Sequence, residues 1–562
     1  MRRTSLFPIV GLLAIASACS SRGAAVGPGG AGSAAGGAGS AAGGAGSAAG
    51  GAGSAAGGAG SAAGAGSVSI AGETSSGGTP GTAGSMPSGA GGGGESRGGA
   101  GGHAGWAGES MGGATVTLPT LVTSTLGAYW KTEGQLTEVT SGTVDVTIDD
   151  RAIAQLWTGF GGTFSERSAD YLSLLSASDQ DAAIKWLFGR DGLRFNYGRI
   201  PIGASDYAID RYTLDETPDD TTMAQFSIER DKQKLIPYIK AALAVAPELH
   251  LWASPWSPPT WMKSNNAFDG GSMKEDDATL QAFALYLTKF VQEYAKLGVP
   301  VEVVHPQKEP NLELDFPSCL WSAAGMTKLI GSYLGPMFAE HKVTAQIFLG
   351  SLSEDDRQGR AQAIIDAVAG DAAGMSYIKG FGFEWDGLNL VAAVKPKNLP
   401  IWQDNHNVGN LPWSTPPGAT FNPTTAPNDH AYAVTSWSFI RDWIQAGVDA
   451  YFTSNMILDS VGVGIGARAW PQNALLVVDP ATKKLIITPA FYVFRHLSPF
   501  VDPGAHVVGT RGGDALAFKN PDGTIVAVLY NSGAAKKTVV AIGGKQLQFD
   551  MPGSGWATLK VN

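Results

Sequence analysis

From about residue 151 to residue 500 the sequence alternates between short segments typical of β-strands and longer segments typical of α-helices. The short segments are rich in β-branched and aromatic residues, whereas the longer ones carry apolar residues at helical spacing. About eight strands that alternate with helices predict an α/β fold, a TIM (β/α)8 barrel. Strands are expected at 193–200, 250–254, 301–309, 345–350, 380–385, 400–403 and 450–454, and helices at 176–189, 229–246, 278–297, 355–369 and 435–446.

After residue 500 the pattern changes to short strands with no helices between them. The residues Asn-Pro-Asp-Gly at 520–523 predict a turn between two of these strands. Residues 501–562 therefore predict a small antiparallel β-sandwich domain, and the strand-like residues 115–150 are expected to join it. This side domain would be built from both ends of the ordered chain.

The first residues have the features of an export signal. A short basic start at 1–3 precedes an apolar run at 6–18, which is too short to span a membrane. The run ends Ala-Ser-Ala-Cys-Ser, which resembles a bacterial lipoprotein signal. We expect residues 1–18 to be the signal peptide and Cys19 to carry a lipid that anchors the chain to the outer membrane or cell surface. The alternative is ordinary cleavage after Ala18 and a secreted protein.

Residues 19–114 consist mostly of Gly, Ala and Ser and contain the repeat Ala-Gly-Ser-Ala-Ala-Gly-Gly. Because large apolar side chains are almost absent, burial cannot offset the entropy that the chain would lose on ordering. The heptad is not a coiled coil, since its core positions lack apolar residues. We therefore expect a disordered, flexible linker.

Charge and cysteine content exclude several classes of function. The formal net charge is −10 and no run of Lys or Arg offers a phosphate-binding surface, so we expect no nucleic-acid partner. The two cysteines, Cys19 and Cys319, cannot form a disulfide framework, and no cluster has metal-ligand spacing. We expect neither a metal nor another cofactor.

Glu309 is the first candidate for a functional residue. It follows the β-branched residues of the strand predicted at 301–309, and Pro310 stops that strand. A carboxylate at the carboxyl end of a central strand is costly unless it is used or paired, and that end is the active-site face of a barrel. A Glu-Pro pair taken alone would favour the alternative, a salt-bridged loop glutamate.

Seven motifs add specificity to this interpretation, and together they resemble glycoside hydrolase family 30 over about residues 120–562. That family includes glucosylceramidases and endo-β-1,6-glucanases, and the segments 317–321 and 401–413 are more similar to the β-1,6-glucanase branch. The motifs are GFGG (159–162), GRIPIG (198–203), ASPWSPPTWMK (253–263), HPQKEP (305–310), IWQ (401–403), GNLPW (409–413) and NMILD (455–459).

The resemblance implies retaining hydrolysis of β-glucosidic bonds, with two glutamates about 5 Å apart at the ends of the fourth and seventh barrel strands. Glu309 falls on the acid/base position. Asp206 and Trp256 fall on sugar-contacting positions, and Trp385 is a further candidate for substrate binding. The implied ligand is a β-glucan or another β-glucoside.

Four positions depart from the family pattern. Lys308 replaces the asparagine that binds the sugar 2-hydroxyl, and Asn405, which follows Asp404, stands at the nucleophile position. Ser454 replaces a tryptophan of the sugar platform, and Glu384 stands where histidine or glutamine is usual. We treat all four as candidate site residues.

These departures put turnover in question. The neutral amide of Asn405 cannot be the carboxylate nucleophile, and the nearby cation of Lys308 favours the ionised form of Glu309. Asp404 is expected to point into the barrel wall unless its strand bulges. Glu384 is an alternative base that would activate water in an inverting reaction. Two hypotheses follow: a hydrolase of β-1,6-glucan or glucosylceramide-like substrates, or a catalytically inactive carbohydrate-binding protein at the cell surface.

Overall fold

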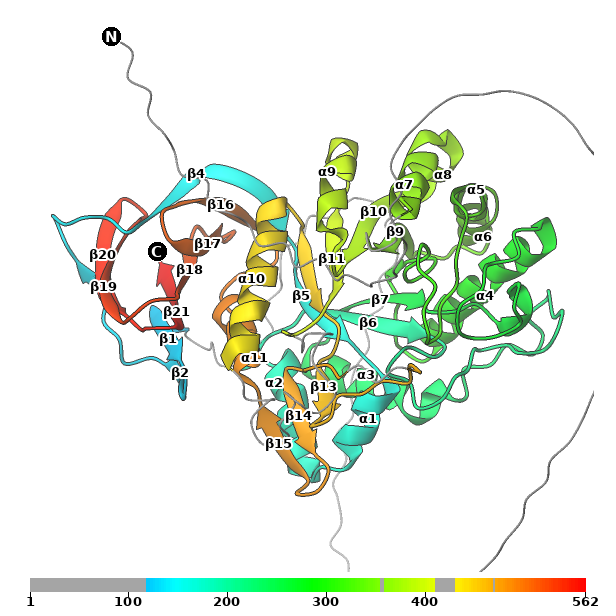
Figure 1. Cartoon of the computed structure of the whole chain (residues 1–562), viewed down its shortest axis with the longest axis horizontal. Helices are drawn as coiled ribbons and strands as arrows, with labels where there is room; N and C mark the ends of the chain where they lie inside the picture. Colours follow the sequence, from blue (N-terminus) through cyan, green and yellow to red (C-terminus); the bar gives the residue numbers. More distant parts are fainter. Residues whose placement is uncertain (1–117, 354–357, 410–429, 468–470) are drawn as a thin grey trace, which may run out of the picture. The chain divides into compact units, whose positions relative to one another are not determined.

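The computed structural model describes residues 118–353, 358–409, 430–467 and 471–562 (Figure 1). The predicted signal peptide, Cys19 and the predicted linker lie outside the described residues. In the described part, eight parallel strands close into a barrel, which confirms the predicted TIM fold. The strands are β5 (Gly159–Thr163), β6 (Tyr197–Ile202), β7 (His250–Pro255), β8 (Val303–Val304), β9 (Gln346–Leu352), β10 (Ile378–Glu384), β11 (Ile401–His406) and β12 (Ala450–Thr453).

Helices connect the barrel strands, and α2 begins and ends close to its predicted bounds, whereas α3, α7 and α10 begin five or six residues away from theirs. For α2, the Ser176 side chain accepts a hydrogen bond from Asp179 N, and Gly189 follows the last turn. The helices are α1 (Glu166–Ser173), α2 (Ala177–Phe188), α3 (Leu235–Val245), α4 (Asp277–Lys296), α5 (Ala323–Lys328), α6 (Gly335–Glu340), α7 (Arg360–Gly370), α8 (Ala372–Tyr377), α9 (Val391–Val394), α10 (His430–Ala446) and α11 (Pro489–Leu497). None of the described helices is long and apolar enough to cross a membrane.

A second sheet of ten described strands is built from both ends of the ordered chain, as predicted. It curls around its own apolar core, to which Leu121, Val146 and Leu559 belong. Its strands are β1 (Leu121–Thr125), β2 (Ala128–Lys131), β3 (Thr137–Glu138), β4 (Val146–Trp157), β16 (Ala505–Arg511), β17 (Asp514–Lys519), β18 (Ile525–Asn531), β19 (Lys536–Ile542), β20 (Lys545–Met551) and β21 (Gly555–Val561). A separate three-stranded sheet contains β13 (Ile457–Asp459), β14 (Leu476–Asp479) and β15 (Lys484–Ile487).

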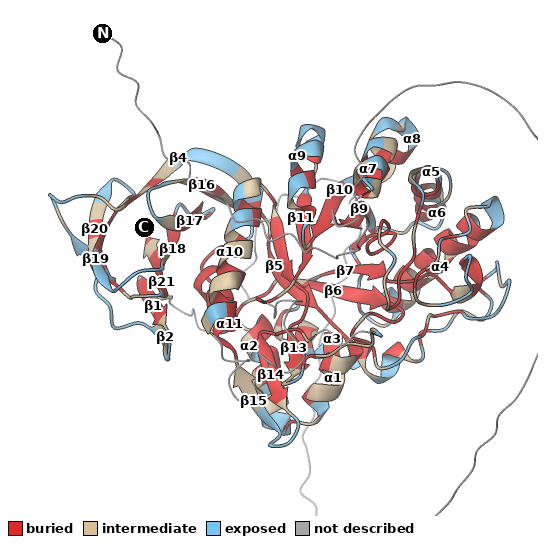
Figure 2. Cartoon of the chain, in the orientation of Figure 1, coloured by how far each residue is buried: buried red, intermediate tan, exposed pale blue. Residues whose placement is uncertain are grey.

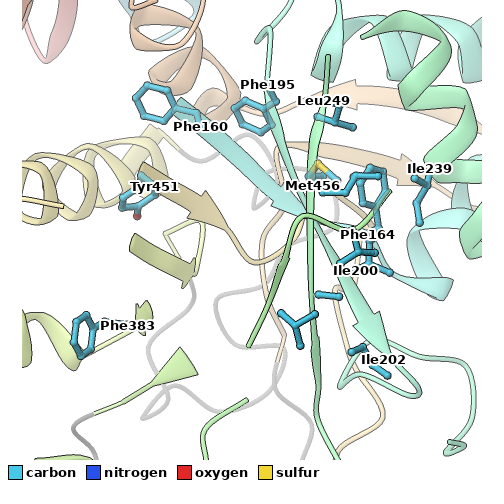
Figure 3. Close-up of a cluster of buried hydrophobic side chains, with 14 of the residues drawn as sticks. Phe160, Phe164, Phe195, Ile200, Ile202, Ile239, Leu249, Phe383, Tyr451 and Met456 are labelled. Atoms are coloured by element: carbon cyan, nitrogen blue, oxygen red, sulfur yellow. The ribbon is translucent and has the colours of Figure 1, made fainter. Parts of the chain in front are cut away.

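The barrel strands are buried along nearly their whole length, whereas the helices expose their outer faces (Figure 2). Figure 3 shows part of the core between barrel and helices, where Phe160, Phe164 and Phe195 lie among aliphatic side chains. Phe164 stacks on Phe188 and meets Tyr238 edge to face. A close-packed shell of this kind fixes the strand ends that carry the candidate site.

A buried carboxyl ties the segment after β6 to helix α4. Asp231 accepts hydrogen bonds from the hydroxyls of Tyr212 at 2.8 Å and Tyr294 at 2.7 Å. Burial raises the pKa of Asp231 to about 6, although the two tyrosine hydrogen bonds oppose the shift. The folded chain therefore holds this proton at a pH where the unfolded chain has released it.

Asp231→Asn is expected to remove a pH-dependent part of the stability. The pKa of Asp231 is raised, so its contribution is complete below pH 3.8 and is lost as the pH rises through about 6. Relative to the variant, the free energy of unfolding of the wild type should fall by about 3 kcal/mol across that window. Urea unfolding at several pH values measures the difference, and parallel profiles would contradict it. Asp449, whose pKa burial also raises to about 6, is present in both proteins and cancels.

Candidate active site

Glu309 lies at the carboxyl end of β8, although the paired residues of that strand stop at Val304. The chain between them is held by its neighbours, because Lys308 N donates to Pro255 O of β7 at 2.8 Å. Glu309 N in turn donates to Ser351 O of β9 at 2.9 Å. Glu309 has a left-handed backbone with φ 45°, which costs about 1–3 kcal/mol and is concentrated at functional sites. The barrel mouth, formed by the carboxyl ends of the strands, therefore includes Glu309.

A β-bulge shapes the end of β11. In the ladder with β10, Gln403 lies opposite Phe383. The next pair joins Asn405 to Glu384, so Asp404 is an extra residue on β11. The bulge breaks the strict alternation of side chains, and consecutive residues can then both face the barrel interior.

Asp404 points into the barrel and not into its wall, which is the exception that the prediction allowed for a bulged strand. Its Oδ2 lies 3.1 Å from His305 Nδ1. Gly382 leaves room for this carboxylate, since a Cβ atom there would come within 2.1 Å of Asp404 Oδ2. Burial lowers the pKa of His305 against the charge of Asp404, so the imidazole is neutral.

A small opening lies among the strand ends at the barrel mouth. Four predicted site residues line it, namely Asp206, Trp256, Asn405 and Ser454. The sequence did not single out the other lining residues, because short polar side chains after a strand carry no local signal of a site. These are Thr163, Ser165, Ser205, Tyr207 and Asn455.

Lys308 is a buried cation between two carboxylates. Its Nζ donates to Glu309 Oε2 and lies 3.3 Å from Glu384 Oε2. It also lies 5.7 Å from the ring centre of Trp256. Burial lowers the pKa of Lys308, but the charges of Glu309, Glu384 and Asp206 raise it by more, so the net shift is upward. Lys308 therefore stays charged and engages Glu309 beside the opening.

Glu384 is fully buried and accepts a hydrogen bond from Asn405 Nδ2 at 2.7 Å. Burial, and then the charge of Glu309, raise the pKa of Glu384 well above its ordinary value. Its Oε1 has no hydrogen-bond partner among the described residues. A carboxyl in this environment binds its proton more tightly than an exposed one does, which makes it a weak candidate for a base that must be ionised.

The spacing of the two glutamates also bears on the role of Glu384. One ammonium, that of Lys308, contacts the Oε2 atoms of both Glu309 and Glu384. These oxygens are therefore closer than the roughly 6.5–9.5 Å that separates an inverting pair. The geometry does not favour the inverting role that the sequence suggested for Glu384, and that role stays a prediction.

Arg199, from the second quoted motif, is a second buried cation that the sequence did not single out as a site residue. Its Nε and Nη2 both donate to Ser254 Oγ, at 3.2 and 2.7 Å. The guanidinium carbon lies 4.3 Å from the ring centre of Trp256 and 4.8 Å from that of Trp252. Burial lowers the pKa of Arg199 and the surrounding carboxylates oppose that shift. Arg199 thus supports the Trp256 ring from below the opening.

Two further predicted residues lie in different places. Asp206 lines the opening, and burial raises the pKa of its carboxyl against the charge of Lys308. Trp385 follows β10 with φ 46°, and its ring stacks on His406 at 6.0 Å. Trp385 is not part of the lining of the opening.

Metal chemistry has no ligand set in the described part of the chain, because no three His, Cys, Asp or Glu side chains there are placed to hold an ion. At the barrel mouth, the ammonium of Lys308 instead pairs with the carboxyls of Glu309 and Glu384. Such a site can bind a neutral polar ligand and move protons.

Comparisons with known proteins agree with this architecture. The model of the glycosyl hydrolase family 30 TIM-barrel domain matches residues 157–501, and the model of the glycosyl hydrolase family 30 beta sandwich domain matches residues 504–559. The two matches divide the chain as the barrel and the C-terminal strands do.

Individual relatives span most of the described chain. A Caenorhabditis elegans protein named as a glucosylceramidase is 30% identical over 421 residues, which cover 71% of this chain and 78% of that protein. An endo-1,6-beta-D-glucanase of Aspergillus fumigatus is 23% identical over 425 residues, covering 69% and 82%. The solved structure of an endo-beta1,6-glucanase superposes with a TM-score of 0.66 at 22% identity, covering 78% of this chain and 99% of that one.

Proposed function

Because this chain belongs to glycoside hydrolase family 30, we propose that its barrel opening binds a β-linked, glucose-configured sugar and that the protein hydrolyses the β-glucosidic bond. The substrate is a β-1,6-glucan or a glucosylceramide-like β-glucoside. These are the substrates that the names of two relatives indicate. Glu309 is the proton donor to the leaving oxygen and afterwards the base that activates water.

One observation carries this proposal: Glu309 follows β8 at the barrel mouth and acts electrostatically on Asp206, which lines an opening together with Trp256. The tryptophan offers apolar area for a sugar ring, and the carboxyl of Asp206 accepts hydrogen bonds from sugar hydroxyls. Asp206 and Glu309 are close enough to influence each other electrostatically. The sugar and the acid therefore meet at one place.

Binding without hydrolysis is the second candidate, and a specific contact favours it. Lys308 hydrogen-bonds to Glu309, which stabilises the carboxylate form of a group that must give up a proton. Asn405 occupies the opening where a carboxylate nucleophile would have to be. A chain with both features can retain its ligand and lose its turnover.

Glu309→Gln is expected to lower kcat/KM for β-1,6-glucan and for an aryl β-glucoside by about 10²-fold or more, because the amide cannot donate the proton. Reducing-sugar release and chromophore release measure the two reactions. Glu293→Gln, on the exposed side of α4 and paired with Lys296, is the matched control and should leave both rates unchanged. Full activity of Glu309→Gln would contradict the assignment.

The same proteins separate the two candidates. Titration of Trp fluorescence with a β-1,6-linked glucose oligosaccharide reports binding whether or not hydrolysis occurs. Binding without hydrolysis selects the second candidate. Absence of both binding and hydrolysis rules out both candidate functions. Trp256→Ala should weaken binding by about 1–3 kcal/mol, since the ring face is lost.

A further inference from the structure

The candidate site has an acid but lacks the atom that must attack the anomeric carbon. Retaining hydrolysis needs a nucleophilic oxygen on the face opposite the leaving group. Within the lining of the opening, Asp206 is the only ionisable carboxyl, and Asn405 presents an amide. Glu384 is fully buried, outside that lining, and behind Asn405. The nucleophile position of the family therefore offers no carboxylate to a retaining reaction, and the proposed function already assigns Asp206 to the sugar hydroxyls.

Asn405 is held in one orientation. Its Nδ2 donates to Glu384 Oε2 at 2.7 Å, and the same oxygen lies 3.3 Å from the Nζ of Lys308. Because Glu384 Oε2 accepts from Nδ2 and lies near the ammonium of Lys308, the nitrogen side of the amide faces Glu384. The Oδ1 atom therefore belongs to the other side, and it makes no hydrogen bond among the described residues. Asn405 Oδ1 is thus an oriented acceptor that can receive a hydrogen bond from a ligand.

Small polar side chains line the opening together with Asn405. Ser454 and Asn455 follow β12, and Thr163, Ser165 and Ser205 line the same opening. Hydroxyl-bearing side chains of this size fill little volume and can hydrogen-bond to a polar group. The Trp256 ring lines the opening as well and offers apolar area to the sugar.

An acetamido group at C2 of the sugar meets both needs. Its N–H is a donor for Asn405 Oδ1, and its carbonyl oxygen can reach C1 of the same ring to form a five-membered ring. A 2-hydroxyl group could also donate to Asn405, but it supplies no nucleophile to replace the missing carboxylate. Hydrolysis assisted by the substrate itself is a known exception to the two-carboxylate scheme.

We propose that the substrate of this site is a 2-acetamido-2-deoxy-β-glucoside, whose own carbonyl oxygen is the nucleophile and whose N–H is oriented by Asn405. This proposal deepens the proposed function and rests on it. The further proposal adds the identity of the sugar to the proposed function. It also gives Asn405 a role, because its side chain would touch the substrate.

The reaction balances without an external reagent. In the first step the acetamido oxygen bonds to C1, the bond from C1 to the leaving oxygen breaks, and Glu309 gives its proton to that oxygen. The positive charge of the resulting oxazolinium ring lies next to Asn405 Oδ1, which accepts its N–H. In the second step water bonds to C1, the ring opens to restore the acetamide, and Glu309 takes the proton from water. The product sugar keeps its anomeric configuration.

The test compares two aryl glycosides with the purified full chain. We expect kcat/KM for the aryl 2-acetamido-2-deoxy-β-glucoside to exceed that for the aryl β-glucoside by at least about 10²-fold, because only the former carries the nucleophile in place. Replacing the N-acetyl group by N-trifluoroacetyl weakens the carbonyl oxygen as a nucleophile. That change should lower the rate by at least about tenfold.

Variants of one residue examine the role of the amide. Asn405→Leu removes the acceptor at similar size and should lower kcat/KM for the acetamido substrate by about 10²-fold. Asn405→Asp keeps an acceptor oxygen and should retain most of the activity. Gln362→Leu, an amide on α7 away from the opening, is the control for the change from amide to apolar side chain and should leave the rate unchanged.

The outcomes separate this inference from the proposed function. Glu309-dependent hydrolysis of the plain β-glucoside without hydrolysis of the acetamido substrate overturns the inference and leaves the proposed function standing. Absence of hydrolysis of either substrate overturns the inference together with the hydrolytic function. A rate that is unaffected by fluorination, or by Asn405→Leu, overturns the role of the acetamido group or of Asn405.

Discussion

Asn405→Glu is expected to raise hydrolysis of an aryl β-glucoside by at least about 10²-fold over the wild-type chain, with retention at the anomeric carbon. The substitution places a carboxylate in the opening beside Asp206 and Trp256. Burial keeps the pKa of Glu384 high, so its proton can form a hydrogen bond to the new carboxylate. Initial rates, and NMR of the first-formed sugar anomer, measure the gain and its stereochemistry.

Asn405→Gln is the matched control, because it adds the same length without charge, and it should bring no gain. Adding Lys308→Asn and Ser454→Trp to Asn405→Glu should raise the rate further, since the first frees Glu309 and the second adds aromatic surface. The three positions share one site, so their effects should not add simply. Strong hydrolysis of the plain glucoside by the wild type, abolished by Asn405→Glu, would mean that another set of groups does the chemistry.

Lys308→Met is expected to lower the free energy of unfolding by about 3–5 kcal/mol at neutral pH. The substitution leaves the carboxyls of Glu309 and Glu384 buried without their shared cation, and breaking one side of a buried ion pair carries this penalty. The deficit of the variant should shrink as the pH falls, because a protonated carboxyl no longer needs a cation beside it. Urea unfolding at pH 5 and pH 7.5 measures it.

Two controls identify the source of that loss. Lys328→Met removes an exposed lysine that pairs with Asp277, and it should leave stability almost unchanged. Adding Glu384→Gln to Lys308→Met removes one of the stranded carboxyls and should recover part of the lost stability. A Lys308→Met chain as stable as the wild type at both pH values would show that the two glutamates are not paired through this lysine.

The barrel and the side domain were predictable because their evidence is local. Helical and strand periodicities, with stop signals such as Ser176 and Gly189 around α2, place the elements to within a few residues. Strands without a distinct pattern were missed, as for β16 (Ala505–Arg511) and for the small sheet of β13 to β15. β8 is far shorter than the predicted strand, since residues after Val304 bond to neighbouring strand ends without forming a regular ladder.

The sequence motifs predicted individual residues of the candidate site, but not the contacts between those residues. Asp206, Trp256, Asn405 and Ser454 do share one opening. The direction of Asp404 could not be read from alternation, because the bulge exists only in the register between β10 and β11. The pairing of Lys308 with Glu384 and the place of Arg199 depend on residues that are distant in sequence, and no local pattern encodes them.

The ten-stranded sheet contains strands from both ends of the ordered chain, so it cannot form fully until synthesis of the chain is complete. Strand β1 pairs with β21, for example Leu121 with Leu559, and β4 pairs with β16. Contacts between residues so far apart along the chain form late and slow folding. Until the ribosome has released the last strand, β1 has no partner on that side. The emerging chain therefore exposes an unpaired strand edge that needs protection from aggregation, and the barrel strands are synthesised before strands β16 to β21 of the sheet.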